Sequence, residues 1–285
     1  MACPSELRNA LVAVYGSLKR GQANHHWLQG ATFLGRCRLP GLVLHNLGPY
    51  PMAVPSPQRH RLIHAELYRL PPGGLAHLDL LEDYPREYDR RLRRLSDGRR
   101  AWVYLGRPEQ VRGCATVPFG DWGATPVFSY GSNLDPQQLR HRCSSWDGLA
   151  AVAQLRGWRW RINKRSQLQA SLGFAGIEPC DRSRCWGAVH HLSHADRAAL
   201  DLREGVSIGQ YSHARVMIRS RCGDRFPVLT YAPQADVRVA GLRCSSDYAG
   251  RILRGAAHHG LPLAWQHWLR RRLSGDPAAL PSWGD

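Results

Sequence analysis

The sequence predicts an α+β protein of two related domains, each a mixed β-barrel with peripheral helices. The first reason is an internal repeat: one apolar run leads into Tyr15-Gly16-Ser17, and another ends in Tyr130-Gly131-Ser132. A glutamate after a Leu-Asp pair follows each tyrosine, 67 residues later at Glu82 and 74 residues later at Glu204. The second reason is length, because 285 residues suit two domains that each bury their own core. Self-similarity over a domain-sized period indicates duplicated structural units.

The first half is predicted to consist mainly of strands. Short β-type segments broken by glycine and proline run from residue 11 to about residue 112. Leu75, Leu78 and Leu81 recur at helical spacing and predict a short helix that ends at Glu82. Alternating segments at 88–95 and 100–105, joined through Ser96-Asp97-Gly98, predict a hairpin. The glycine-containing segment 114–125 is predicted to be a linker.

The second half is predicted to repeat this order and to add two helices. A strand is expected at 126–130, and then a helix at 135–142 with Asp135 as its cap and Pro136 at its first position. The elements expected next are a strand at 185–192, a helix at 193–202 capped by Ser193, hairpin strands at 211–219 and 225–232, and helices at 245–255 and 263–273. The predicted domains are therefore 10–113 and 126–275, with a flexible tail at 276–285.

Composition and cysteine usage indicate a cytoplasmic protein. The chain is 43% hydrophobic, and no apolar run is long enough to span a bilayer. The first residues lack a basic segment followed by a long apolar one, so we expect no signal peptide and no membrane partner. The eight cysteines are then expected to be reduced thiols. Cys180 and Cys185 form the only close pair and lack a second half with zinc-ligand spacing, so we expect no metal site.

The formal net charge of +17 is the one unusual feature of the composition. Lys19 and Lys164 are the only lysines, so nearly all of this charge comes from arginine. Arginine-rich runs lie at 90–94, 156–165 and 270–272. Runs of this kind usually form solvated faces, but they also bind polyanions. The basic surface therefore has two open interpretations: a solvated face, or a docking surface for nucleic acid or an acidic carrier.

The repeated motif has chemistry of its own. A glycine after a strand lets the backbone approach a ligand closely, and consecutive exposed amides can hold a carboxylate or a developing oxyanion. Glu82 follows Leu80 and Leu81, and Glu204 lies close to Val206. A carboxylate held in an apolar cleft has a raised pKa and can act as general base and then general acid. Because both parts recur in the same order, we expect one such site in each domain.

Further motifs accompany the repeat in the second half. They are Tyr130-Gly131-Ser132-Asn133, Trp186-Gly187, Leu200-Asp201-x-x-Glu204-Gly205-Val206, Gly209-x-Tyr211, Ser246-Asp247-Tyr248 and Gly255-Ala256-x-x-x-Gly260-Leu261-Pro262. Together they resemble the gamma-glutamylcyclotransferases over nearly all of the second half.

A different set of motifs covers residues 11 to about 105. They are Tyr15-Gly16-Ser17-Leu18-Lys19-Arg20-Gly21, Asn24-His25, Tyr50-Pro51, Glu66-Leu67-Tyr68, Leu78-Asp79-x-x-Glu82, and Tyr84-Pro85 with Tyr88-x-Arg90. This set is similar to the smaller gamma-glutamylamine cyclotransferase branch, the avirulence-induced-protein type.

These resemblances imply a reaction. A gamma-glutamyl amide is cyclised when its own α-amine attacks its side-chain carbonyl, which gives 5-oxoproline and a free amine. No cofactor is needed, because both reacting groups belong to one molecule. The implied general acid and base are Glu82 in the first domain and Glu204 in the second. The implied substrate-binding residues are Tyr15, Gly16, Ser17, Leu18, Tyr88 and Tyr104 in the first domain, and Tyr130, Gly131, Ser132, Asn133, Tyr211, Tyr231 and Tyr248 in the second.

Two other interpretations stay open at this point. In one, the domains are non-catalytic binding modules whose arginine-rich surface holds RNA or an acidic protein. In the other, catalysis is kept but the gamma-glutamyl group is attached to an acidic carrier that docks on the positive surface. The presence of both Glu82 and Glu204 favours an enzyme over the non-catalytic module.

Overall fold

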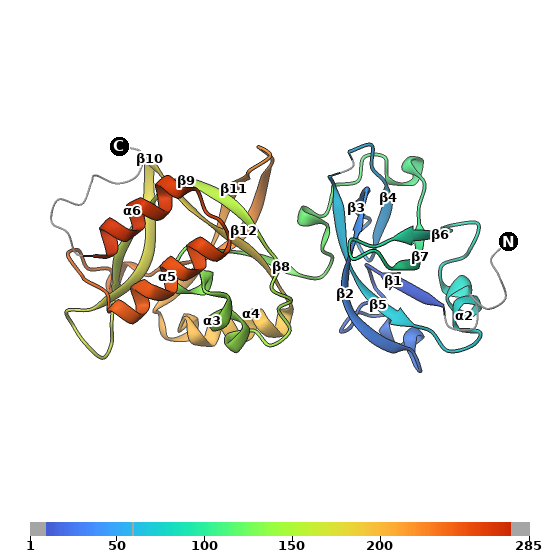
Figure 1. Ribbon diagram of the computed structural model, residues 1–285, viewed down its shortest axis with the longest axis horizontal. Helices are drawn as coiled ribbons and strands as arrows, with labels where there is room; N and C mark the ends of the chain where they lie inside the picture. The colour runs from blue at the N-terminus through green and yellow to red at the C-terminus, as the bar shows by residue number, and fades with distance from the viewer. Residues whose placement is uncertain (1–9, 59, 275–285) are drawn as a thin grey trace. The chain divides into compact units, whose positions relative to one another are not determined.

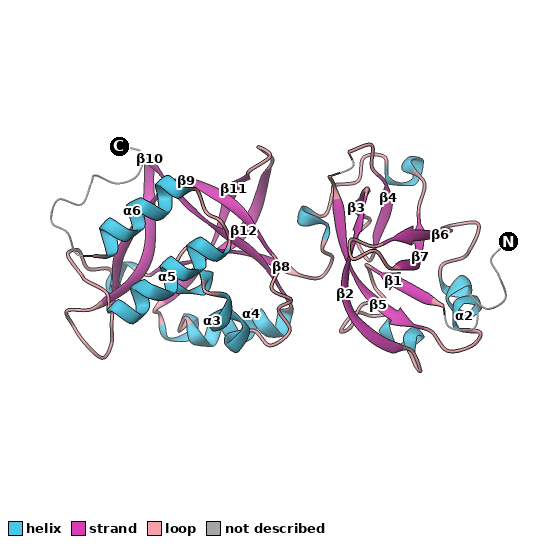
Figure 2. Ribbon diagram, in the orientation of Figure 1, coloured by secondary structure: helices cyan, strands magenta, loops and turns pink. Residues whose placement is uncertain are grey.

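The fold comes from a computed structural model, in which residues 10–58 and 60–274 are described. The chain divides between Gly123 and Ala124 into two compact units (Figure 1). The flexible tail expected at 276–285 lies outside the described residues. Each unit combines strands with short helices, so the α+β class predicted from the sequence is confirmed (Figure 2).

A five-stranded mixed sheet with the strand order β2-β5-β1-β7-β6 forms the body of the first unit, and β3 and β4 form a separate two-stranded sheet. These strands are β1 (Leu11–Val14), β2 (Thr32–Pro40), β3 (Leu42–Asn46), β4 (Pro51–Pro55), β5 (Leu62–Arg69), β6 (Asp89–Arg94) and β7 (Arg100–Leu105). β1 pairs antiparallel with β5 and parallel with β7. β6 and β7 form the predicted antiparallel hairpin.

The sheet of the first unit is open, which differs from our expectation of a barrel in each domain. Its two edge strands are β2 and β6. Of the six residues of β6, five are charged. Charged side chains are typical of edge strands because they oppose further pairing. The alternation of apolar residues predicted the strands correctly, but it does not determine whether a sheet closes.

A short helix, α2 (Gly74–Leu81), carries the first glutamate. The turn before it contains Gly73, whose φ of 78° lies in the left-handed region that favours glycine. Leu75 and Leu78 are buried against the sheet, at 4% and 0% exposure, and fix the orientation of the helix. The helix ends at Glu82, whose amide donates a hydrogen bond to the Leu78 carbonyl. Burial of one helical face thus holds Glu82 at a defined place.

Most of the segment that we expected to be a linker instead packs into the first unit. Thr116 forms a β-bridge with His45. The Lys19 ammonium lies 2.6 Å from the Asp121 carboxylate in a buried ion pair, and it also donates to the Trp122 carbonyl. The glycines at 120 and 123 indicated correctly that the segment is irregular. They gave no sign of these contacts, which join residues about a hundred positions apart.

The second unit is built on a closed five-stranded barrel with the order β10-β8-β12-β11-β9. These strands are β8 (Thr125–Ser129), β9 (Ala150–Arg165), β10 (Gly173–Leu192), β11 (Tyr211–Ser220) and β12 (Arg225–Pro233). β12 and β8 are parallel, whereas the other neighbours are antiparallel. The predicted hairpin of β11 and β12 is confirmed. The strand expected at 185–192 is only the last part of the much longer β10, and β9 was not predicted.

Four helices flank the barrel: α3 (Pro136–Arg142), α4 (His194–Arg203), α5 (Ser246–His258) and α6 (Leu263–Leu273). Asp135 caps α3 by accepting the Gln137 amide hydrogen, and Ser193 caps α4 by accepting that of Asp196. Both predicted caps are therefore confirmed. The short 3-10 segments are η1 (His25–Leu28), η2 (Pro108–Val111), η3 (Pro118–Gly120), η4 (Ser132–Leu134), η5 (Val206–Ile208) and η6 (Ala235–Val237).

Two global features follow from the described residues. None of their helices is both long and apolar enough to cross a membrane. All seven described cysteines are free thiols: Cys37, Cys114, Cys143, Cys180, Cys185, Cys222 and Cys244.

Two candidate active sites

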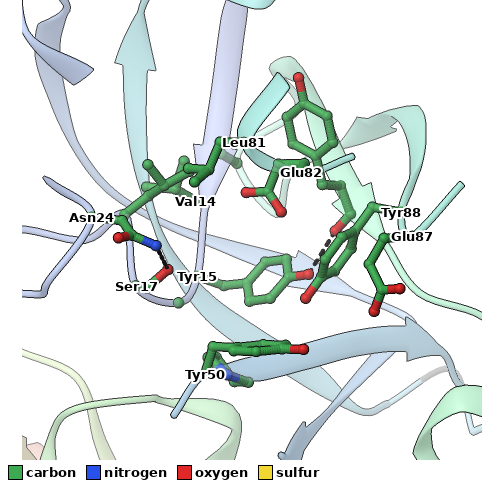
Figure 3. Close-up of a pocket in the computed structure, with 14 residues that line it drawn as sticks. Val14, Tyr15, Ser17, Asn24, Tyr50, Leu81, Glu82, Glu87 and Tyr88 are labelled. Carbon is green, nitrogen blue, oxygen red and sulfur yellow. Dashed lines mark hydrogen bonds between the residues drawn. The ribbon is translucent and has the colours of Figure 1, made fainter. Parts of the chain in front are cut away.

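In the first unit, the loop after β1 and the end of α2 border one cavity of about 230 Å³. Figure 3 shows the Glu82 carboxylate directed into this cavity, with Ser17 and Asn24 on one side and Tyr88 on the other. The Asn24 side chain donates a hydrogen bond of 3.0 Å to the Ser17 hydroxyl. The cavity brings together every residue that we expected in the first site: Tyr15, Gly16, Ser17, Leu18, Glu82, Tyr88 and Tyr104.

The Glu82 carboxylate has no ionic partner among the described residues. Within the described part of the chain, its carboxylate forms neither an ion pair nor a hydrogen bond, and Leu81 and Tyr88 line the cavity beside it. Burial therefore raises the pKa of Glu82 to about 7. A carboxyl group with this pKa is present in both protonation states near neutral pH. It is suited to take up a proton and then return it.

A hydrogen-bond network fixes the walls of the first site. The Tyr15 hydroxyl donates to the Tyr104 carbonyl at 2.7 Å, which ties the loop to β7. The Tyr104 hydroxyl in turn donates to the Asp79 carboxylate at 2.7 Å, and Arg90 forms an ion pair with the same carboxylate. Asp79 lies one helical turn before Glu82. The network therefore holds the loop, β7 and the end of α2 in one arrangement.

The loop after β1 presents free amide groups. Among the described residues, no acceptor is found for the amide hydrogens of Gly16, Ser17 and Leu18, whereas the Gly16 carbonyl accepts from the Lys19 amide. These three residues line the same cavity as Glu82. Successive unpaired amides form a concave site for a carboxylate or an oxyanion.

The second unit contains the corresponding constellation in a much smaller cavity of about 30 Å³. It lies where the loop after β8 meets the end of α4. The cavity brings together every residue that we expected in the second site: Tyr130, Gly131, Ser132, Asn133, Glu204, Tyr211, Tyr231 and Tyr248. As in the first unit, no acceptor for the amide hydrogens of Gly131, Ser132 and Asn133 is found among the described residues.

Glu204 has polar partners that Glu82 lacks. Its Oε1 accepts hydrogen bonds from the Asn133 side chain at 2.9 Å and from Arg142 at 3.1 Å. Burial raises the pKa of Glu204, while Arg142, Asn133 and the nearby Lys164 oppose this rise because they favour the charged form. Both contacts reach Oε1, so in the described part of the chain Oε2 stays available to a bound molecule.

The network that supports the first site is repeated in the second. The Tyr130 hydroxyl donates to the Tyr231 carbonyl, and the Tyr231 hydroxyl donates to the Asp201 carboxylate. His213 and Arg197 contact the same carboxylate. Asp201 precedes Glu204 by three residues, as Asp79 precedes Glu82. The two units thus use one scheme to fix the loop and the glutamate-bearing helix.

The sequence did not single out several of these residues. Asp79 and Asp201 could have been identified, because the repeated Leu-Asp-x-x-Glu spacing contains them. Tyr50 and Glu87 also line the first cavity, and Tyr50 stands in one of the motifs that carry the resemblance. Arg142 gave no signal, since only folding brings α3 against Glu204, 62 residues away.

The described residues contain no group of three or more His, Cys, Asp or Glu side chains that could hold a metal ion. The groups that line both cavities are carboxylate, hydroxyl, side-chain amide and backbone amide groups. Such groups bind a small polar molecule and move protons.

Comparison with known proteins agrees with this arrangement. Residues 12–124 match the family model described as gamma-glutamyl cyclotransferase, AIG2-like, and residues 184–269 match the AIG2-like family model. The gamma-glutamylcyclotransferase family protein YtfP of Escherichia coli K12 is 39% identical over 112 residues, which are 39% of this chain and 94% of that protein. The human gamma-glutamylaminecyclotransferase is 36% identical over 97 residues, which are 30% of this chain and 61% of that protein.

The crystal structure of YkqA from Bacillus subtilis covers 94% of this chain and 98% of its own, at 21% identity and a TM-score of 0.46. On the sequence matches, the chain belongs to the gamma-glutamylcyclotransferase family. Because two separate segments match AIG2-like models, it carries the family domain in tandem.

Proposed function

We propose that each unit converts gamma-glutamyl amides or peptides to 5-oxoproline and a free amine, with Glu82 and Glu204 as the general acid and base. One observation carries this proposal: in both units, the carboxylate and the unpaired amides of the Tyr-Gly-Ser loop line the same cavity. Family membership supports the reaction class, and a gamma-glutamyl compound is the proposed small-molecule substrate.

The proposed reaction begins when the glutamate carboxylate removes a proton from the α-ammonium of the substrate. The freed amine attacks the γ-carbonyl carbon, and the loop amides stabilise the negative charge that develops on the carbonyl oxygen. The bond between this carbonyl carbon and the leaving nitrogen then breaks. Ring closure removes two protons from the α-nitrogen, and the leaving amine takes up two, so the glutamate ends as it began. The site supplies most of the rate enhancement by holding the substrate in a folded conformation, because nucleophile and electrophile belong to one molecule.

The proposal is tested by 5-oxoproline release from a panel of gamma-glutamyl compounds. Glu82→Gln should inactivate the first site and Glu204→Gln the second. Turnover by the double variant should fall by a factor of roughly a hundred to ten thousand, which is the usual contribution of general acid–base catalysis. Glu109→Gln removes an exposed glutamate of the first unit and is the matched control. Parental 5-oxoproline release by a folded double variant would rule out both glutamates.

A further inference from the structure

The outer surface of the second-unit barrel has a groove of about 560 Å³ that shares no residue with the second cavity. It is lined by parts of β9 and β11 and by the turn that leads into β12. Along β11, Val216 and Ile218 are buried, at 6% and 1% exposure, whereas Arg215, Met217 and Arg219 are exposed, so these alternate residues share the outward face. We call this surface, with Arg156, Trp158, Arg215, Arg219 and Arg225 in its lining, the arginine groove.

The arginine groove brings like charges together in the sheet register. Arg219 on β11 lies directly opposite Arg225 on β12. On the neighbouring strands, Arg156 of β9 lies directly opposite Arg184 of β10. Like charges in directly opposed cross-strand positions destabilise a sheet. Two such pairs on adjacent strands indicate a function other than stability.

The lining of the arginine groove supplies no negative charge to offset these arginines. None of the residues that line the arginine groove is acidic, and Asp181 and Asp224, the acids nearest along the chain, are not among them. Within the described residues, Arg215, Arg219 and Arg225 form no ion pair. Arg156 donates only to the neutral Gln154 side chain. The guanidinium groups are therefore available to an anion, and their planar fork fits phosphate oxygens well.

Trp158 adds an aromatic surface to the arginine groove. Its side chain is half-buried, and no ring contact or hydrogen bond is found for it among the described residues. An indole beside several guanidinium groups in one groove is the combination that binds single-stranded nucleic acid, because arginines follow the phosphates and the ring stacks on a base. An acidic peptide would pair with the arginines but offers no base to stack on Trp158.

We propose that the arginine groove binds single-stranded nucleic acid, as a second activity of this chain that is separate from the cyclotransferase site. The proposal does not depend on catalysis, because its test reads out binding alone. The volume of the groove lies within the range that holds small ligands, so it can enclose a short stretch of a strand rather than a duplex.

The first test measures binding of the full chain to fluorescein-labelled oligouridylate by fluorescence anisotropy over a range of salt concentrations. The double variant R219E/R225E should bind at least about tenfold more weakly at low salt, and its dependence of log K on log salt should be shallower by about 1.4, at about 0.7 per phosphate contact. The matched control is R270E/R271E, which makes the same charge change at exposed positions of α6. Circular dichroism and 5-oxoproline release should be unchanged in both.

The second test concerns Trp158. Trp158→Ala should weaken binding by about fivefold to a hundredfold, the usual effect of losing one stacked base. Trp158→Phe, which keeps an aromatic ring, should bind more tightly than the alanine variant. Equal losses in R219E/R225E and R270E/R271E would overturn the proposal, because they would reveal only a general response to charge. The proposal would also be overturned if Trp158→Ala bound the oligouridylate as tightly as the parent and polyglutamate displaced the oligouridylate at equal charge. That result would favour an acidic protein partner.

Discussion

The two units place a glutamate at the same point of the same motif but surround it differently. Glu82 lies without a described ionic partner, and burial alone raises its pKa to about 7. Glu204 accepts hydrogen bonds from Asn133 and Arg142, which limit the same effect of burial. The duplicated scaffold thus keeps the position of the carboxylate constant while its neighbours set the pKa. Position and proton affinity are separate properties of these sites.

The two cavities also differ in volume, and the first is the larger. About 230 Å³ is open in front of Glu82, whereas about 30 Å³ is open in front of Glu204. The second volume has room for little more than a water molecule. Tyr211, Tyr248 and Ala175 all line this second cavity. The Tyr211 hydroxyl donates a hydrogen bond to the Ala175 carbonyl, and the Ala175 amide donates one to the Tyr248 hydroxyl oxygen. The second site therefore leaves less open space for a bound molecule than the first.

Among the substitutions that leave both glutamates in place, the largest expected effect comes from the loop glycine of the second unit. A Cβ atom at Gly131 would lie 3.2 Å from the Ala175 Cβ and 3.3 Å from the Tyr248 hydroxyl, so a larger side chain must displace Tyr248. We expect Gly131→Val to lower turnover by the second site roughly a hundredfold, since displacement by about 1 Å costs that much. The rate is measured in the Glu82→Gln background. Turnover by the first site, measured with Glu204→Gln, serves as the control and should not change.

The pH dependence of each site tests the contrast between the two glutamates directly. Below its pKa a glutamate is protonated and cannot accept the α-ammonium proton, so activity falls as pH drops through that value. In the Glu204→Gln background, turnover by the first site should rise with pH around 7. In the Glu82→Gln background, turnover by the second site should rise at lower pH. Arg142→Met should then move this second rise upward by roughly one pH unit or more, because a nearby cation lowers a carboxyl pKa by about that amount.

Stability should respond to different extents to the two glutamine substitutions. The pKa of Glu82 is higher in the folded than in the unfolded chain, so the free energy of unfolding falls as pH rises from the unfolded pKa towards about 7 and stays low above it. At pH 8, Glu82→Gln should therefore raise the free energy of unfolding by about 1–2 kcal/mol. Glu204→Gln should raise it by less, because the loss of the ionic partner of Arg142 offsets part of the gain. Urea unfolding checks both, and at pH 5 the gain from Glu82→Gln should be largely lost.

The smallest expected effect is that of salt on catalysis. The net charge of +17 attracts anionic substrates over a range that salt screens to about 8–10 Å. Neither cavity is lined by an arginine or a lysine, so this attraction is long-range only. Turnover of a small gamma-glutamyl compound should change only a few-fold between low and moderate salt at fixed pH. A steep loss would instead place arginines in contact with the substrate.

The repeat made most of both sites predictable from the sequence. Tyr15, Glu82 and their counterparts Tyr130 and Glu204 stand in motifs that occur twice, and the caps Asp135 and Ser193 have local signatures that the structure confirms. The ion pair between Arg142 and Glu204 was not predictable. It joins two helices that are distant in the chain, and no local pattern encodes such a contact.

The missed strand β9 has a different physical cause. Its residues include a run rich in arginine, which we interpreted as a charge run without assigning a strand. In the barrel, Trp160 is 2% exposed and packs against Trp268 of α6, while Arg156 stays exposed on the outer surface. Long charged side chains on the outer face weaken the apolar alternation on which strand prediction relies. Of the arginines in this run, Arg156 also forms part of the arginine groove.

The ion pair between Lys19 and Asp121 decides where the chain can be cut. A fragment that stops at residue 113 keeps Lys19, a residue that is only 6% exposed, and lacks the Asp121 carboxylate that neutralises its ammonium group. An uncompensated buried charge costs about 3–5 kcal/mol, much of the roughly 5–15 kcal/mol that holds a domain together. A fragment that continues to Gly123 retains the pair and the Trp122 carbonyl contact. The shortest fragment that should fold as the first unit therefore ends at Gly123. This end lies ten residues beyond residue 113, where the predicted domain ends.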